Sequence, residues 1–202
     1  MKNYYHAFAN GDESRNFIIS EKDYSFEFNL IGICAANSAA KVLAFSLEDS
    51  HPHFLLYGEH SDCASFLSHF EYSSKKHISG TRGRLERVKM AFQMYLADSD
   101  DYLRNVASYV CVQATKDGKK IMPYDYFWGT GSMYFRGPKH IPIWCITDNG
   151  KVIEPTQYSS LCYEEKRRIT NGKDVIPADW LVCNGLILPC NYVDVNRFEN
   201  IF

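Results

Sequence analysis

The chain has no excess of positive charge and no long apolar run. Its 22 lysines and arginines are outnumbered by 24 aspartates and glutamates, which gives a net charge of -2. Proteins that bind nucleic acid through its phosphates usually carry an excess of lysine and arginine, so the overall charge gives that class no support. No stretch is apolar enough to span a bilayer, and the first residues lack the apolar core of a secretory signal. The sequence therefore predicts a cytoplasmic protein with no membrane partner.

The sequence also lacks closely paired cysteines. Its seven cysteines are odd in number and widely spread, and no two form a Cys-x-x-Cys pair. This spacing indicates neither a disulfide framework nor a zinc knuckle, and it favours reduced, mostly buried thiols. What the chain does have is apolar material, with 46% hydrophobic and 15% aromatic residues among 202. That is enough to bury a sizeable core, as one large domain or as one domain with an extension.

Hydrophobic periodicity predicts an alternation of strands and helices. Ser20 with Asp23 three positions later is typical of a helix N-terminal cap. Pro52 fits the first residue of a strand, because proline donates no hydrogen bond to a sheet. The pattern predicts strands over 4–9, 42–48 and 54–57, helices from 21 to about 40 and from 61 or 62 to about 77, a short segment over 88–95, and a helix that starts at 99–101.

Two histidines, His51 and His53, stand at the start of the second strand of a predicted hairpin. Residues two apart on a strand face the same way, so both imidazoles can bind one metal ion. With seven histidines in the chain, such a pair also arises by chance. The pair therefore needs a partner elsewhere in the sequence.

The candidate partner is a polar pair on the last predicted helix. Four residues form one stripe of that helix: Tyr102, Val106, Tyr109 and Gln113. A tyrosine on such a stripe is ordinarily part of the core. A glutamine is not, because its amide needs hydrogen-bond partners when it is buried. The stripe therefore predicts that Tyr109 and Gln113 are directed together at a site.

Positive charge is concentrated in one segment of the chain. Between residues 75 and 89 there is a single acid, and the cations are Lys75, Lys76, Arg82, Arg84, Arg87 and Lys89. Such a segment can contact phosphates, although charge alone favours a solvated helical surface.

The order of these elements and motifs resembles the HUH single-tyrosine transposases, and in particular the REP-associated tyrosine transposases. The resemblance covers about residues 4–135 and predicts a transposase-like domain over 1–136, followed by an extension of unknown role over 137–202. It is carried by Tyr4-Tyr5-His6-Ala7-Phe8, His51-Pro52-His53-Phe54-Leu55-Leu56, Phe92-Gln93, Asp100-Asp101-Tyr102-Leu103, Tyr109-Val110 and Tyr126-Phe127-Trp128 with Ser132 and Tyr134.

The order of elements predicts an α+β fold, with a ferredoxin-like or RRM-like antiparallel sheet and helices packed mainly on one face. The resemblance implies that Tyr109 is a nucleophile that cleaves and rejoins DNA through a 5'-phosphotyrosine. His51, His53 and Gln113 would then hold a divalent ion, Mg²⁺ or Mn²⁺, that polarises the phosphodiester. The implied partner is single-stranded DNA that forms a hairpin, with the basic residues between 75 and 89 on its backbone, and the protein would be a monomer or a homodimer.

Two other functions stay open at this point. In the first, the chain is a domesticated or inactive HUH-fold protein that still binds DNA but has lost cleavage. In the second, it is an unrelated metal-dependent phosphodiesterase, and Tyr109 is only part of the core.

Overall fold

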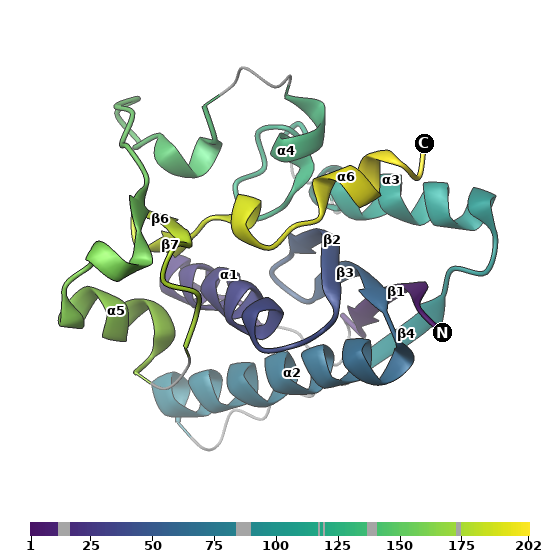
Figure 1. Ribbon diagram of the computed structural model, residues 1–202, viewed down its shortest axis with the longest axis horizontal. Helices are drawn as coiled ribbons and strands as arrows, with labels where there is room; N and C mark the ends of the chain where they lie inside the picture. The colour runs from purple at the N-terminus through teal and green to yellow at the C-terminus, as the bar shows by residue number, and fades with distance from the viewer. Residues whose placement is uncertain (12–16, 84–89, 117, 119, 137–140, 173–174) are drawn as a thin grey trace.

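The first half of the chain folds as β-α-β-β-α-β (Figure 1). The computed structural model describes residues 1–202 except 12–16, 84–89, 117, 119, 137–140 and 173–174. The six elements are β1 (Asn3–Ala9), α1 (Glu21–Ala36), β2 (Lys41–Leu47), β3 (Pro52–Gly58), α2 (His60–Arg82) and β4 (Phe92–Leu96). The strands form an antiparallel sheet in the order β2-β3-β1-β4. This is the ferredoxin-like α+β arrangement predicted from the sequence, which is thus confirmed.

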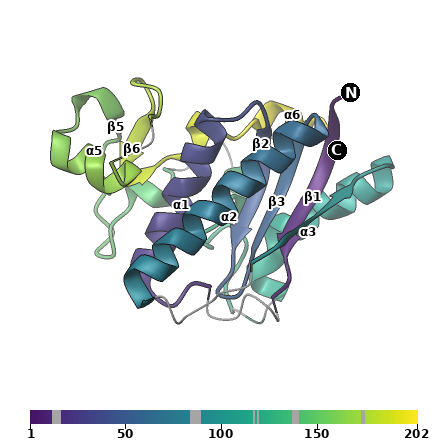
Figure 2. The same cartoon turned by 90° about the horizontal axis from the view of Figure 1, so that it is seen from below.

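The sheet has helices on both of its faces. Figure 2 shows α1 and α2 side by side over the sheet, with α3 (Asp100–Lys116) beyond it. The alternation of side chains along β3 explains these layers. Phe54 and Leu56 belong to the core cluster that contains α1 and α2, while Leu55 lies in a second cluster with Val106 and Val110 of α3. Each face of the sheet therefore has its own apolar core.

The helix α1 begins where the sequence predicts and ends short of residue 40. Ser20 caps it, since the Ser20 hydroxyl accepts a hydrogen bond from the Asp23 backbone N–H at 3.2 Å. At the other end the Asn37 side-chain amide donates to the Ile33 carbonyl oxygen at 2.8 Å. This side chain satisfies a terminal carbonyl and ends the helix.

The helix α2 is longer than the sequence predicts, because it continues beyond His77 to Arg82. The extra turn is held by tertiary contacts that local sequence does not show. Ile78 is buried, and the Arg82 guanidinium donates to Asp23 Oδ2 at 2.8 Å and to the Phe17 carbonyl oxygen at 3.0 Å. The helix ends at Gly83, whose φ of 87° lies in the region that glycine adopts without strain.

Beyond α3 the chain forms short elements that pack on the first half. These are α4 (Gly131–Phe135), η1 (Ile143–Cys145), β5 (Thr156–Gln157), η2 (Tyr158–Ser160), α5 (Tyr163–Thr170), β6 (Leu181–Cys183), β7 (Leu186–Ile187), η3 (Pro189–Asn191) and α6 (Val195–Glu199). The boundary predicted after residue 136 adjoins residues 137–140, which lie outside the described part of the chain.

Two contacts join the C-terminal segment to the two cores. The Asn29 side chain of α1 donates to the Gly185 carbonyl oxygen at 2.9 Å and accepts from the Ile187 backbone N–H at 2.8 Å. Phe198 and Ile201 join the cluster between the sheet and α3. Within the described residues, no helix is both long and apolar enough to cross a membrane.

The interface between α1 and α2 contains a buried carboxyl group. Glu27 is fully buried, and its Oε2 accepts a hydrogen bond from the Ser74 hydroxyl at 2.6 Å. Burial raises the pKa of Glu27 to about 8, and the hydrogen bond from Ser74 offsets only part of that effect. Glu27 is therefore largely protonated at neutral pH in the folded protein.

This carboxyl group predicts a specific pH dependence of stability. The pKa of Glu27 is about 8 in the folded protein and 4.5 when the carboxyl group is fully solvated, so its contribution to stability is complete below pH 4.5 and is lost as pH rises through 8. We expect Glu27→Gln, which keeps the shape without the charge, to gain stability over wild type on the order of 5 kcal/mol as pH rises from 4.5 to above 8. Urea unfolding of both proteins at pH 5, 7 and 9 measures this. A constant difference between them would contradict the assignment.

Candidate active site

Three histidines meet on the face of the sheet that α3 crosses. His53 lies on β3 and His6 on the neighbouring β1, while His51 stands directly before β3. The Nε2 atoms of His51 and His53 are 2.9 Å apart. On its other side, His53 presents Nδ1 to His6 Nε2 at 3.4 Å, and the two rings are stacked with an interplanar angle of 17°. The predicted pair thus lies on one face of the sheet, and His6 adds a third imidazole to it.

Burial keeps two of these rings neutral. His53 is 2% exposed, and burial lowers its pKa to about 2, with the charges of His51 and His6 as smaller causes. Burial also lowers the pKa of His6 to about 4. A neutral imidazole has one nitrogen lone pair free to accept a proton or bind a metal ion. At neutral pH the cluster therefore offers lone pairs and adds no positive charge from His6 or His53.

Ser50 and Gly11 lie against the third ring, His51, on its Nδ1 side. The Ser50 hydroxyl lies 2.6 Å from His51 Nδ1. Gly11 backs the same ring so closely that a Cβ there would stand 2.8 Å from His51 Nδ1. Any larger residue at position 11 would have to displace the ring. The Nε2 atom of His51 is thereby turned toward His53.

Tyr109 comes to this cluster from α3. Its ring centroid lies 5.5 Å from that of His53 and 5.8 Å from that of His6, with interplanar angles of 75° and 73°. A hollow of about 380 Å³ opens beside these rings. It is lined by His6, Phe8, Ala9, Asn10, Gly11, His51, His53, Gln93 and Tyr109. Tyr109 is half-buried at its wall, so the structure brings together three of the four residues that the sequence predicts for the site.

Gln113 is the fourth predicted residue. It follows Tyr109 by about one turn of α3 and is 3% exposed. It is not among the residues that line the hollow. Its place on the buried side of α3 agrees with the predicted stripe, whereas its role as a metal ligand stays a prediction.

The histidine pair fits a divalent metal ion. Two nitrogens that bind one ion at about 2.1 Å each are separated by roughly 3 Å when they occupy adjacent positions. The 2.9 Å between the two Nε2 atoms matches that separation. Ligand histidines usually bond a second group through the opposite nitrogen, as Ser50 and His6 allow here. The described residues contain no group of three or more His, Cys, Asp or Glu arranged for a metal ion.

The predicted DNA-binding cations that the structure describes do not join the histidines. Arg84, Arg87 and Lys89 lie outside the described residues. Lys75, Lys76 and Arg82 are on α2, which covers the opposite face of the sheet from α3.

Two of these three cations form ion pairs with carboxylates of the protein. Lys75 forms an ion pair with Glu71. The Arg82 side chain is 8% exposed and pairs with Asp23. Arg82 therefore acts between α1 and α2 rather than at the surface, because a buried guanidinium needs its carboxylate.

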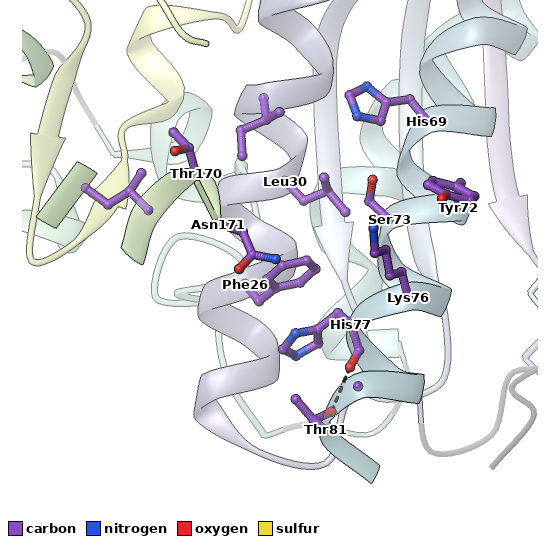
Figure 3. Close-up of a pocket in the computed structure, with 13 residues that line it drawn as sticks. Phe26, Leu30, His69, Tyr72, Ser73, Lys76, His77, Thr81, Thr170 and Asn171 are labelled. Atoms are coloured by element: carbon purple, nitrogen blue, oxygen red, sulfur yellow. Dashed lines mark hydrogen bonds between the residues drawn. The ribbon is translucent and has the colours of Figure 1, made fainter. Parts of the chain in front are cut away.

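A second hollow lies on that opposite face, and Lys76 is on its wall. It measures about 440 Å³ and lies between α1, α2 and the end of α5 (Figure 3). Phe26 and His77 stack there with ring centroids 3.8 Å apart, and His77 Nε2 contacts Asp23 Oδ1 at 3.1 Å. Figure 3 shows His69 and Lys76 on the same side of this hollow, along α2. None of the residues around Tyr109 lines it.

Sequence reasoning did not assign His6 to the site. The predicted strand over residues 4–9 places Tyr4, His6 and Phe8 on one face, which is a partial signal. The sequence does not show how β1 pairs with β3. In that pairing Phe8 lies opposite His53, and His6 is the diagonal neighbour of His53. That register depends on the whole sheet and is not encoded by the residues around His6.

No protein-family model matches the sequence, and no curated protein matches it. Among solved structures, the chain is similar to a REP-associated tyrosine transposase bound to a REP hairpin. The two share 13% identity, the match covers 75% of this chain and 93% of the other, and the TM-score is 0.48.

The histidine geometry predicts which substitutions remove metal binding. We expect the unchanged protein to bind Mn²⁺ in isothermal titration calorimetry and His51→Ala to abolish that binding. His6→Ala should weaken it about tenfold, because His6 supports His53 without being a ligand. His69→Ala, on α2 at the other face, is the matched control and should bind as the wild type does. Equal affinities of wild type and His51→Ala would remove the histidine pair as the metal site.

Proposed function

We propose that this protein is a metal-dependent endonuclease and strand transferase for single-stranded DNA, with Tyr109 as its nucleophile. One observation carries the proposal. The Tyr109 ring lies within 6 Å of two buried imidazoles, at the wall of a hollow that can admit a phosphate. Tyr109 packs against the apolar cluster of α3, as a core tyrosine would, but its ring also faces the two imidazoles, which an apolar core does not require.

The proposed reaction exchanges one phosphoester for another. The Tyr109 phenol oxygen attacks the scissile phosphorus and forms a Tyr–O–P bond, which attaches the tyrosine to the 5' end of the fragment on the 3' side of the break. The bond from phosphorus to the 3' oxygen breaks, and that oxygen leaves as a free 3'-hydroxyl after taking up a proton. The phenol supplies the proton that balances the step. The reverse attack by a 3'-hydroxyl rejoins DNA without a nucleotide cofactor, because the phosphotyrosine keeps the energy of the bond.

His51 and His53 would hold the divalent ion through their Nε2 atoms, and Gln113 is proposed as a further ligand. When bound, Mg²⁺ or Mn²⁺ supplies a Lewis acid that polarises the phosphate and stabilises the negative charge that develops on it. The protein's own part is to keep His53 neutral by burial, to orient it through His6 and to place Tyr109 beside it.

Aromatic side chains next to the hollow favour unpaired bases. Phe8 lines the hollow and stacks on Tyr95 of β4, with ring centroids 5.7 Å apart and an interplanar angle of 17°. Tyr95 is 48% exposed. An exposed aromatic face binds a base by stacking, which requires that the base be free of a duplex. We therefore propose single-stranded DNA as the substrate, with a hairpin beside the cleaved bond as the sequence resemblance implies.

A covalent adduct is the direct test of this function. We expect the protein with Mn²⁺ and a pool of 3'-labelled single-stranded oligonucleotides to give a labelled protein band in a denaturing gel, because the 5' phosphate of the 3' fragment stays on the tyrosine. Tyr109→Phe should reduce the band to background. Tyr102→Phe, a substitution of the same kind on the same helix at a site that is 37% exposed, should leave it unchanged.

Other results identify the other functions. An adduct that survives Tyr109→Phe removes Tyr109 from its role. Cleavage without an adduct, at a rate that Tyr109→Phe does not change, indicates a metal-dependent phosphodiesterase. Binding of DNA without cleavage or adduct indicates a protein that has lost the activity.

A further inference from the structure

We propose that Lys116 contacts the scissile phosphate, so that its ammonium group neutralises the reacting centre beside Tyr109. This inference rests on the proposed function and adds a catalytic residue to it. Neither the motifs around the histidines nor the basic segment between residues 75 and 89 indicates this lysine.

The position of Lys116 relative to the nucleophile carries the proposal. The Lys116 Nζ atom lies over the Tyr109 ring, 4.4 Å from its centroid. Both residues are on α3, seven positions apart, so they lie on one side of the helix about two turns from each other. A cation over an aromatic face is held there by the charge distribution of the ring. The tyrosine is thus flanked by His6 from β1, by His53 from β3 and by Lys116 from its own helix.

A lysine beside the hollow adds positive charge that the described lysine-free and arginine-free lining does not supply. The described residues that line it include no lysine, arginine, aspartate or glutamate. Lys116 is exposed at the last turn of α3, and its flexible stem lets the ammonium move from the ring to a phosphate oxygen.

The reaction makes this contact stronger as it proceeds. A phosphodiester carries one negative charge, and the attack of the phenol oxygen adds negative charge to the non-bridging oxygens in the transition state. These oxygens are bonded to the phosphorus that Tyr109 attacks, so they come next to the ammonium over its ring. An ion pair that strengthens toward the transition state raises the rate of the chemical step. Lys116 gives up no proton, and the step balances as written above.

A structural role for Lys116 makes different predictions. A lysine in the last turn of a helix also stabilises that helix by complementing its dipole. Loss of that effect would change stability and leave the rate of adduct formation by the folded protein unchanged. Rate measurements on folded variants therefore separate the two roles.

The experiment measures single-turnover adduct formation with the 3'-labelled oligonucleotide that the wild-type protein captures best. We expect Lys116→Met to slow adduct formation about 10- to 100-fold at saturating DNA and Mn²⁺. Lys116→Arg should restore most of the rate, because it keeps the charge. The slope of log affinity against log salt should fall by about 0.7 in Lys116→Met, the value for one contact to a single-strand phosphate.

Two controls accompany these variants. Lys166→Met removes a lysine that lies over a different tyrosine, with Nζ 5.6 Å from the Tyr158 ring centroid, and should leave the adduct rate within about twofold. Mn²⁺ binding by Lys116→Met should equal that of the wild type, which shows that the histidine pair and the fold are intact.

The outcomes separate this inference from the function on which it rests. If the wild type forms the adduct and Lys116→Met forms it equally fast, the Lys116 contact is overturned and the function stands. An equal slowing by Lys116→Met and Lys166→Met, or a failure of Lys116→Arg to recover activity, also overturns the contact. If the wild type forms no adduct, the function itself is overturned, and the Lys116 contact with it.

Discussion

The packing of α3 across the open face of the sheet is the constraint on which the candidate site depends. Leu103, Val106, Ala107 and Val110 are buried in one cluster with Leu43, Ala44 and Leu55 of the sheet. Rotation of the helix by one residue would turn every side chain by about 100° and would expose this apolar stripe to water. Tyr109 shares the helix with the stripe, so the apolar packing determines its distance from the histidines. The burial of apolar side chains on α3 therefore determines where the Tyr109 phenol lies.

The sheet contributes the histidines of the site, and burial of side chains on its two faces also determines their position. Alternation along β3 sends Phe54 and Leu56 to one core and His53 to the face of α3. Burial then lowers the pKa of His53 and leaves its ring neutral, with His6 and His51 on either side. The two faces of the sheet differ in chemistry as a result. The α1–α2 face holds the buried ion pair of Asp23 and Arg82, and the α3 face holds neutral imidazoles and a phenol.

Much of this arrangement could be predicted from local sequence. The periodicity and the capping pair at Ser20 and Asp23 give the order of elements, and that order gives the ferredoxin-like sheet. The side-chain alternation places His51 and His53 on one face, and the helical stripe places Tyr109 and Gln113 on another surface. What joins the two surfaces is the crossing of α3 over β3, and only the resemblance to a known family indicated it.

The rest depends on tertiary contacts. The last turn of α2 is stabilised by Asp23, which is 59 positions away from Arg82, so no local pattern could show it. His6 joins the site through strand pairing, and Lys116 through its place two turns after Tyr109 on α3. The charge pattern of the sequence predicted Arg82 and Lys75 as DNA-binding residues. In the structure Arg82 pairs with Asp23, and Lys75 pairs with Glu71. Net charge shows that a chain has cations, while only the fold shows which of them are available to a ligand.

The central claim is that Tyr109 becomes covalently bound to DNA, and mass spectrometry of the trapped complex tests it most directly. Digestion with nuclease and trypsin would leave a short nucleotide on one peptide. Cleavage after Arg104 and Lys116 releases residues 105–116, a peptide in which Tyr109 is the only tyrosine. The account predicts that this peptide carries the added mass of a 5'-linked nucleotide. The same mass on a peptide that contains Tyr95 or Tyr102, with none on residues 105–116, would contradict it.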